Sequence, residues 1–154
     1  MHHSIKLGNY KLFISLNHST RVRGVNSILP DGRHFLLWDF DEQSLNTITQ
    51  GLTLIQEKYE LSTIYIVNSG TVRRYHAYCF TAQSWPDTLH ILADTPLICQ
   101  TYFKIGILRG YFTLRITPKG NERFIQVGTI YGRYPATCNP AEFNSFVDYD
   151  TKGR

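Results

Sequence analysis

Runs of apolar residues along the chain predict strands that alternate with amphipathic helices. Residues 34–40 are apolar at nearly every position, which is typical of a strand buried on both faces. Over 45–59 the apolar residues recur in steps of three and four, which predicts a helix capped by Ser44. Two stretches rich in β-branched and aromatic residues, 63–67 and 75–80, predict further strands.

The remaining segments have weaker patterns. Short helices are expected over 86–93 and from Pro96 onward, and strands over 111–116 and 124–130 are expected to pair as a hairpin. Three segments lie outside this core: a strand over 10–16, a polar turn-rich stretch over 21–32 and an irregular strap after Pro135. The order of elements predicts an α/β (α+β) fold, with a mixed, mainly antiparallel sheet and helices packed on it.

Composition agrees with a folded domain and adds little about function. The 154 residues fit a single domain over 1–154, and 42% hydrophobic with 18% charged residues is an ordinary globular balance. The formal net charge of +4 is a weak indication of a polyanionic partner. Three cysteines without CxxC spacing favour reduced thiols. No apolar run is long enough for a membrane span and the first residues lack a signal-peptide core, so no membrane partner and a cytoplasmic location are expected.

Two aspartates at the end of the 34–40 strand are the first candidates for chemistry. Asp39 and Asp41 are separated by one residue, so on a strand both carboxylates lie on the same face. Two adjacent carboxylates repel each other, and a divalent cation with a preference for oxygen ligands relieves that repulsion. The spacing alone is equally compatible with acids that cap a turn or the following helix.

A histidine and several basic residues follow on later elements. His76 lies on the strand over 75–80, after a turn that contains Ser69 and after Arg73 and Arg74. Arginines there would hold phosphate oxygens, and the histidine would donate a hydrogen bond to them. A basic pair at the end of the 111–116 strand, Arg115 and Lys119, would suit a nucleotide or a template phosphate. A core histidine and solvated surface cations are the alternatives.

Taken in order, these motifs resemble those of the archaeo-eukaryotic primase and primase-polymerase superfamily. The motifs are Asp39-Phe40-Asp41, the Ser69-Gly70 turn that leads to His76, and residues 114–119, and the resemblance covers about 33–130. It implies an RRM-like sheet and a nucleotidyltransferase that makes or extends primers on a single-stranded DNA template from nucleoside triphosphates. A separately encoded replicative helicase is a possible partner of such an enzyme.

The resemblance also implies roles for individual residues. Asp39 and Asp41 would bind Mg²⁺ or Mn²⁺, and His76 would contact the incoming nucleotide as the third catalytic residue. The residues expected to bind nucleotide or template are Ser69, Arg73, Arg74, Arg115 and Lys119.

Two positions depart from the superfamily pattern. Its third motif usually contains another aspartate, where this chain has Thr117, so Glu42 or an acid of the tail would have to replace it. Its histidine motif has a small residue two places before the histidine, where this chain has Arg74. Weak binding of a second metal ion, or loss of catalysis, would follow from the first departure.

Two other functions remain open. A non-catalytic single-strand-binding protein would stack bases on exposed aromatic rings, for which the candidates are Tyr65, Tyr75, Tyr78 and Phe112. A HUH-type replication nuclease needs two alternating histidines on one strand, and His76-Ala77-Tyr78 contains one. No P-loop, dinucleotide-binding glycine motif or HExxH is present.

Overall fold

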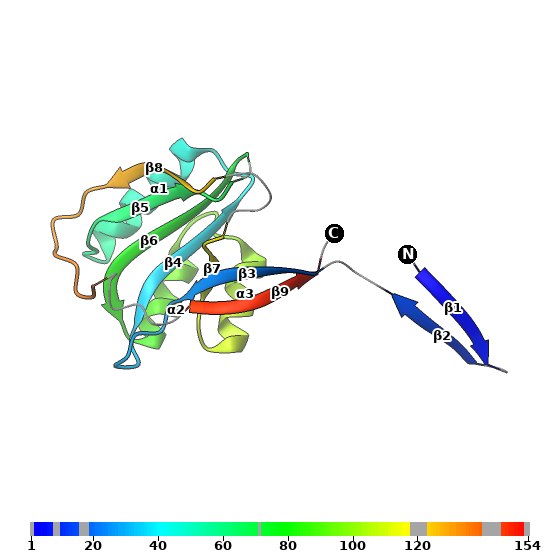
Figure 1. Ribbon diagram of the computed structural model, residues 1–154. Helices are drawn as coiled ribbons and strands as arrows, with labels where there is room; N and C mark the ends of the chain where they lie inside the picture. Colours follow the sequence, from blue (N-terminus) through cyan, green and yellow to red (C-terminus); the bar gives the residue numbers. More distant parts are fainter. Residues whose placement is uncertain are drawn as a thin grey trace.

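The protein has a mixed α+β fold. The computed structural model describes the backbone of residues 2–7, 10–15, 19–70, 72–117, 123–139 and 146–152, and side chains over 22–70, 72–117 and 123–139. The described residues form three helices and three sheets in which all paired strands are antiparallel (Figure 1). No helix of the described residues is long and apolar enough to cross a bilayer.

The largest sheet has four strands in the order β4-β6-β5-β8. Their bounds are β4 His34–Asp41, β6 Arg74–Gln83, β5 Ile64–Asn68 and β8 Ile125–Ile130. Because β6 is antiparallel to both of its neighbours, β4 and β5 run parallel to each other on either side of it. Helix α1, Leu45–Lys58, connects these two strands, so this half of the sheet is a split β-α-β unit.

The other strands form two smaller sheets. In the three-stranded sheet, β3 Ser19–Asn26 lies between β7 Thr113–Arg115 and β9 Phe146–Lys152. Strands β1 His2–Leu7 and β2 Tyr10–Ser15 form a hairpin, which Figure 1 shows apart from the larger sheets.

This arrangement corrects three predictions. The polar stretch over 21–32 contains most of β3, whose backbone pairs with a strand on each side although its sequence has no apolar run. Strand β7 pairs with β3 and β8 pairs with β5, so they do not form the expected hairpin with each other. The tail after Pro135 also contributes a regular strand, β9, rather than an irregular strap. In all three cases the pairing partner is remote in sequence, so local patterns did not indicate it.

Strand β4 lies at an edge of the four-stranded sheet, whereas a central position is what the apolar run over 34–40 suggests. Three of its outward-facing backbone groups nevertheless have hydrogen-bond partners outside the sheet. The Phe35 N–H donates to the Ser27 carbonyl over 3.0 Å, and the Asp39 carbonyl accepts from the Cys99 N–H over 2.8 Å. The Leu37 carbonyl accepts from the Tyr102 hydroxyl over 3.0 Å. A loop and a helix thus cover this edge, which explains why so apolar a strand can occupy it.

The three helices lie close to their predicted positions, and α1 follows the predicted periodicity. On α1, Ser44 caps the first turn, and Ile48, Leu52 and Ile55 are buried as predicted. Gln56 is also buried, although it is polar. Its side-chain amide donates to the carbonyls of Ser62 and Ile130, both over 3.0 Å, so a polar side chain is needed there to join the helix to the sheet. The other helices are α2 Trp85–Asp94 and α3 Gln100–Arg109.

A buried hydrogen bond joins β4 to the end of α2. The indole Nε1 of Trp38, which is fully buried, donates to the Thr95 hydroxyl over 2.9 Å. That hydroxyl also donates to the Ile91 carbonyl over 2.8 Å. Both groups of this pair are therefore satisfied inside the core, and the position of the segment after α2 is fixed relative to β4.

Thr95→Val should destabilise the fold by about 1–3 kcal/mol, because it leaves the buried Trp38 N–H without an acceptor. Thr53→Val is the matched control, since the Thr53 hydroxyl donates only to Thr49 of its own helix. Urea unfolding followed by tryptophan fluorescence measures both. Equal, small effects of the two substitutions would contradict the assigned role of Thr95.

Candidate functional site

The predicted acidic and basic residues meet on one face of the β4-β6 pair. Asp39 lies opposite His76 and Asp41 lies opposite Arg74 in the antiparallel register. Because the Asp39 carbonyl bonds outward to Cys99, Asp39 and His76 form a non-hydrogen-bonded pair, in which side chains approach most closely. His76 Nε2 is 3.6 Å from Asp39 Oδ1, and Arg74 Nε is 3.3 Å from Asp41 Oδ1.

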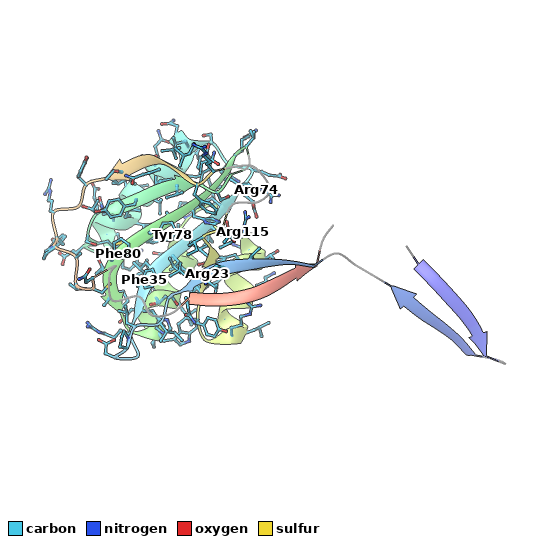
Figure 2. All side chains as sticks on the ribbon, in the orientation of Figure 1. Arg23, Phe35, Arg74, Tyr78, Phe80 and Arg115 are labelled. Carbon is cyan, nitrogen blue, oxygen red and sulfur yellow. The ribbon has the colours of Figure 1, made fainter. Side chains whose placement is uncertain are left out.

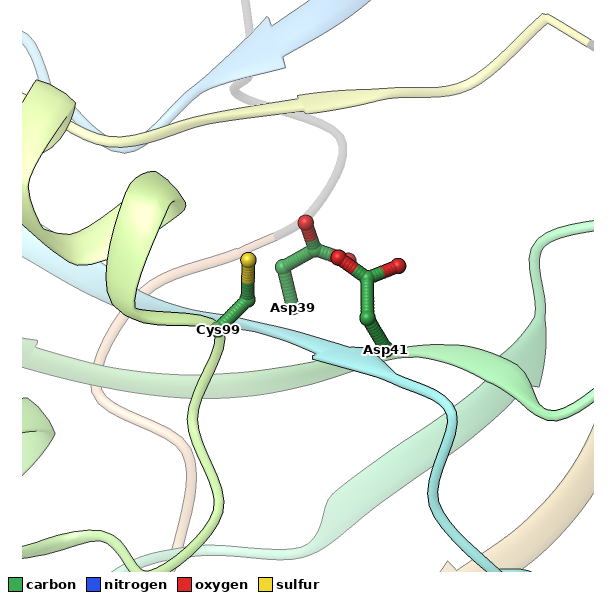
Figure 3. Close-up of side chains that lie close together, drawn as sticks. All are labelled: Asp39, Asp41 and Cys99. Carbon is green, nitrogen blue, oxygen red and sulfur yellow. The ribbon is translucent and has the colours of Figure 1, made fainter.

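A third side chain, which sequence reasoning missed, joins the two carboxylates. One carboxylate oxygen of Asp39, one of Asp41 and the Cys99 sulfur all lie within 4.8 Å of one another (Figure 3). Cys99 is the N-cap residue of α3 and reaches the site because its N–H is bonded to β4. Nothing in the sequence connects it to Asp39. A cysteine at the start of a predicted helix, where serine or aspartate is preferred, was the available signal.

Two cavities border this cluster. One of about 400 Å³ is lined by Asp39, Asp41, Cys99, Tyr102 and residues along α3 as far as Arg109. A second of about 240 Å³ is lined by the same two aspartates together with Ser69, His76 and Arg115. Arg74 and Thr113 line both. The carboxylates therefore stand where the two cavities meet, with guanidinium groups around them.

Burial dominates the electrostatics of the site. It raises the pKa of Asp39 to about 7, and the neighbouring Asp41 adds to the rise while Arg74 and Arg115 oppose it. Burial lowers the pKa of His76 to about 4, and the positive charge of Arg115 also lowers it. His76 is therefore neutral at pH 7, and its contact with Asp39 is not an ion pair. A divalent cation at the carboxylates would replace the proton that Asp39 otherwise retains.

The other predicted binding residues divide into three groups. Ser69 and Arg115 lie together at the second cavity, where the Ser69 carbonyl accepts a hydrogen bond from Arg115 Nη2 over 3.3 Å. Arg73 is exposed and is not among the described residues that line either cavity. Lys119 lies outside the described residues.

Thr117, which stands where the superfamily has its third acid, does not face the cluster. The Thr117 hydroxyl accepts from the Arg23 N–H over 3.1 Å, so it is bound to the backbone of β3. Glu42, the suggested substitute, is exposed and lines neither cavity. On β7 the residues that face the aspartates are Thr113 and Arg115. Among the described residues, Asp39 and Asp41 are thus the carboxylates of the site.

The aromatic residues proposed for stacking do not share one surface. Tyr65 and Tyr78 are paired across β5 and β6 on the face that bears His76, and Figure 2 shows Tyr78 and Phe80 following Arg74 along β6. Tyr75 alternates to the opposite face, and Phe112 is buried in the core, so neither lies on the surface that bears His76. Phe124, which sequence reasoning missed, has its ring centroid 5.7 Å from His76 and 5.7 Å from the Arg115 guanidinium carbon.

Comparisons with protein-family models, curated proteins and solved structures find no match for this chain. The resemblance of its motifs to primase-polymerases therefore remains a hypothesis, which the geometry of the site has to support.

Asp39→Asn should stabilise the metal-free protein, and more so at pH 8 than at pH 5. The folded state raises the pKa of Asp39 from 3.8 to about 7, so its destabilising effect is absent below pH 3.8 and grows as the pH rises to about 7. The expected gain is about 2–4 kcal/mol at pH 8 and about 1–2 kcal/mol at pH 5. Chemical unfolding in EDTA at the two pH values measures it.

Asp31→Asn is the control for this comparison, because Asp31 is exposed and its hydrogen bonds with Arg33 lower its pKa. That variant should show no gain at pH 8. A gain for Asp39→Asn that is independent of pH would show that the Asp39 carboxyl ionises normally.

Proposed function

We propose that this protein is a metal-dependent nucleotidyltransferase that extends or makes primers on single-stranded DNA, with an RRM-like primase-polymerase core. The observation that carries the proposal is the convergence of Asp39, Asp41 and His76, from two strands, at cavities lined by Arg74 and Arg115. The split β-α-β unit that holds these residues supports the RRM-like part of the proposal.

The side chains fit the binding of a cation and a triphosphate together. Asp39 and Asp41 supply hard oxygen ligands of the kind that Mg²⁺ and Mn²⁺ prefer. A divalent ion bound there would polarise phosphoryl oxygens and neutralise their charge. Arg115 and Arg74 would bind the remaining phosphate oxygens. Arg74 now contacts Asp41, and a cation bound to Asp41 would weaken that contact and free the guanidinium group for phosphate. His76 is neutral at pH 7, so its ring donates a hydrogen bond to phosphate without adding a charge.

Three of the four non-glycine residues with a left-handed φ among the described residues lie next to this site, and the fourth, Glu60, does not. The three are Glu42, Arg73 and Leu97, with φ values of 60°, 61° and 65°. Each lies within two residues of Asp41, Arg74 or Cys99 respectively. Non-glycine residues in this region are uncommon and occur preferentially at functional sites, where the surrounding structure holds them. The strain therefore supports a functional role for this part of the sheet.

A single-strand-binding protein without catalytic activity is the second candidate. This candidate is favoured by the lack of a third acid on β7. Thr117, which stands at the position of that acid, is bound to β3, and Arg115 lines the cavity beside the two aspartates. Tyr65, Tyr78 and Phe124 would then serve as stacking surfaces beside the arginines.

Primer extension distinguishes the two candidates. The wild-type chain, with a primed single-stranded DNA template, nucleoside triphosphates and Mn²⁺, should incorporate nucleotides. Asp39→Asn and Asp41→Asn should each reduce incorporation at least about a hundredfold, because the ion loses a charged ligand. Asp31→Asn should leave it unchanged. Absence of incorporation by a wild-type chain that binds the template would select the second candidate.

The salt dependence of binding to single-stranded DNA tests the arginines. Arg74→Gln or Arg115→Gln should lower the slope of log affinity against log salt by about 0.7 for each phosphate that the variant no longer neutralises. Arg33→Gln is the control, because Arg33 is paired with Asp31 on the turn before β4. The slope is measured by fluorescence anisotropy over a salt series. Unchanged slopes for both site variants would show that these guanidinium groups do not bind the strand.

A further inference from the structure

Cys99 occupies a helix N-cap without acting as a cap. At the other two helices the N-cap serine accepts a hydrogen bond from the first turn, from the Thr47 N–H to Ser44 and from the Asp87 N–H to Ser84. Cys99 makes no side-chain hydrogen bond of this kind with α3. Its sulfur lies instead beside the carboxylates of Asp39 and Asp41 (Figure 3).

The backbone holds the Cys99 sulfur in this place. The Cys99 N–H donates to the Asp39 carbonyl over 2.8 Å, and the Cys99 carbonyl accepts from the Phe103 N–H over 3.0 Å. One turn further along α3, the Tyr102 hydroxyl donates to the Leu37 carbonyl. With bonds to β4 at both positions, the start of α3 cannot move away from the aspartates without breaking the edge of the sheet.

The His76 ring places a polar nitrogen at the smaller cavity, next to the aspartates. The His76 side chain is only 8% exposed, and its Nε2 lies 3.6 Å from Asp39 Oδ1, beyond hydrogen-bond distance. Nε2 makes no hydrogen bond with the described residues, whereas Nδ1 is 3.4 Å from the Tyr78 hydroxyl. No buried side-chain nitrogen or oxygen of the described residues lacks a hydrogen bond, so Nε2 is open to the cavity rather than sealed in the core. It can therefore bond to a water or phosphate ligand of an ion that the aspartates hold.

We propose that Cys99 is the third protein ligand of the ion, and that its sulfur makes the site select thiophilic divalent ions such as Co²⁺ and Zn²⁺ over Mg²⁺. This rests on the proposed function only in taking Asp39 and Asp41 as metal ligands. On coordination the thiol proton leaves to solvent and the thiolate sulfur binds the ion. Two carboxylates and one thiolate leave further coordination positions for water or phosphate oxygens.

The preference follows from the chemistry of the ligands. Mg²⁺ requires nearly ideal octahedral oxygen coordination and gains little from sulfur. Thiolates favour softer ions, and the affinity of a given site for first-row ions is higher for Co²⁺ and Zn²⁺ than for Mn²⁺. The missing third acid is thus replaced, in space, by a thiol from α3 rather than by any described residue near Thr117.

Titration of the chelator-treated protein with Co²⁺ tests the proposal without any assay of activity. A thiolate ligand gives a sulfur-to-cobalt charge-transfer band in the near ultraviolet, which wild type should show at one equivalent of Co²⁺. Cys99→Ser should abolish the band and weaken Co²⁺ binding at least about tenfold, with Mg²⁺ binding changed much less. Cys138→Ser, at another half-buried cysteine that forms no disulfide, should retain the band. Absence of the band in wild type, or its persistence in Cys99→Ser, would overturn the proposal.

Cys99→Asp provides the converse test. Aspartate is a favoured N-cap residue, so α3 should still form, and a third carboxylate should raise Mg²⁺ affinity about tenfold or more by calorimetry while removing the cobalt–sulfur band. Thr117→Asp is the control and should not raise it, because that side chain is bound to Arg23 of β3. Stronger Mg²⁺ binding in Thr117→Asp than in Cys99→Asp would overturn the assignment.

The two proposals fail in different ways. A cobalt–sulfur band that depends on Cys99, in a protein that incorporates no nucleotide, would support the ligand assignment and reject the nucleotidyltransferase. Incorporation that requires Asp39 and Asp41, without any cobalt–sulfur band, would support the enzyme and reject Cys99 as a ligand.

Discussion

The hydrogen bond from the Cys99 N–H to the Asp39 carbonyl is the interaction on which the rest of the site depends. Strand β4 is buried on both faces yet lies at the edge of its sheet, so its outward carbonyls need donors that are not on a neighbouring strand. The start of α3 supplies them, through the Cys99 N–H and the Tyr102 hydroxyl. In the β4-β6 ladder Asp39 and His76 form a non-hydrogen-bonded pair, which brings their side chains close together and leaves the Asp39 carbonyl free for Cys99. The bond to that carbonyl then places the Cys99 sulfur at the carboxylates.

Once these groups are held together, their charges cannot all be satisfied by the protein alone. Burial keeps His76 neutral and raises the pKa of Asp39 to about 7, so the cluster contains an acid that resists ionisation and a histidine that does not neutralise it. Arg74 and Arg115 reduce the repulsion, but they approach from the cavity walls rather than from between the carboxylates. In the proposed function, a divalent cation would satisfy both aspartates at once and release the arginines for an anion. The same cluster would then account for the binding of a cation and of phosphate.

Local sequence patterns were sufficient to predict the elements of the split β-α-β unit and the relative placement of Asp39 and Asp41. The apolar run of β4, the Ser44-capped periodicity of α1 and the alternation along β6 depend on neighbouring residues, so they predicted the elements and placed Asp39 and Asp41 on one face. The partners of β7, β8 and β9 are remote in sequence and were wrongly predicted or missed. Cys99 and Phe124 were missed for the same reason, because only tertiary pairing brings them to His76 and the aspartates.

The position of the third acid shows where motif order stops being informative. Residues 114–119 follow the first two motifs at the expected place in the chain, and β7 does reach the site, where Thr113 and Arg115 line the cavities. Strand β7 pairs with β3, however, and this pairing turns Thr117 toward the Arg23 backbone. A motif read along one strand therefore cannot identify the third side chain beside the two aspartates, because that position is open to whichever segment covers the edge of β4. In this chain the segment is the start of α3, so the hydrogen bonding of a sheet edge, rather than the third motif, determines which atom completes the cluster.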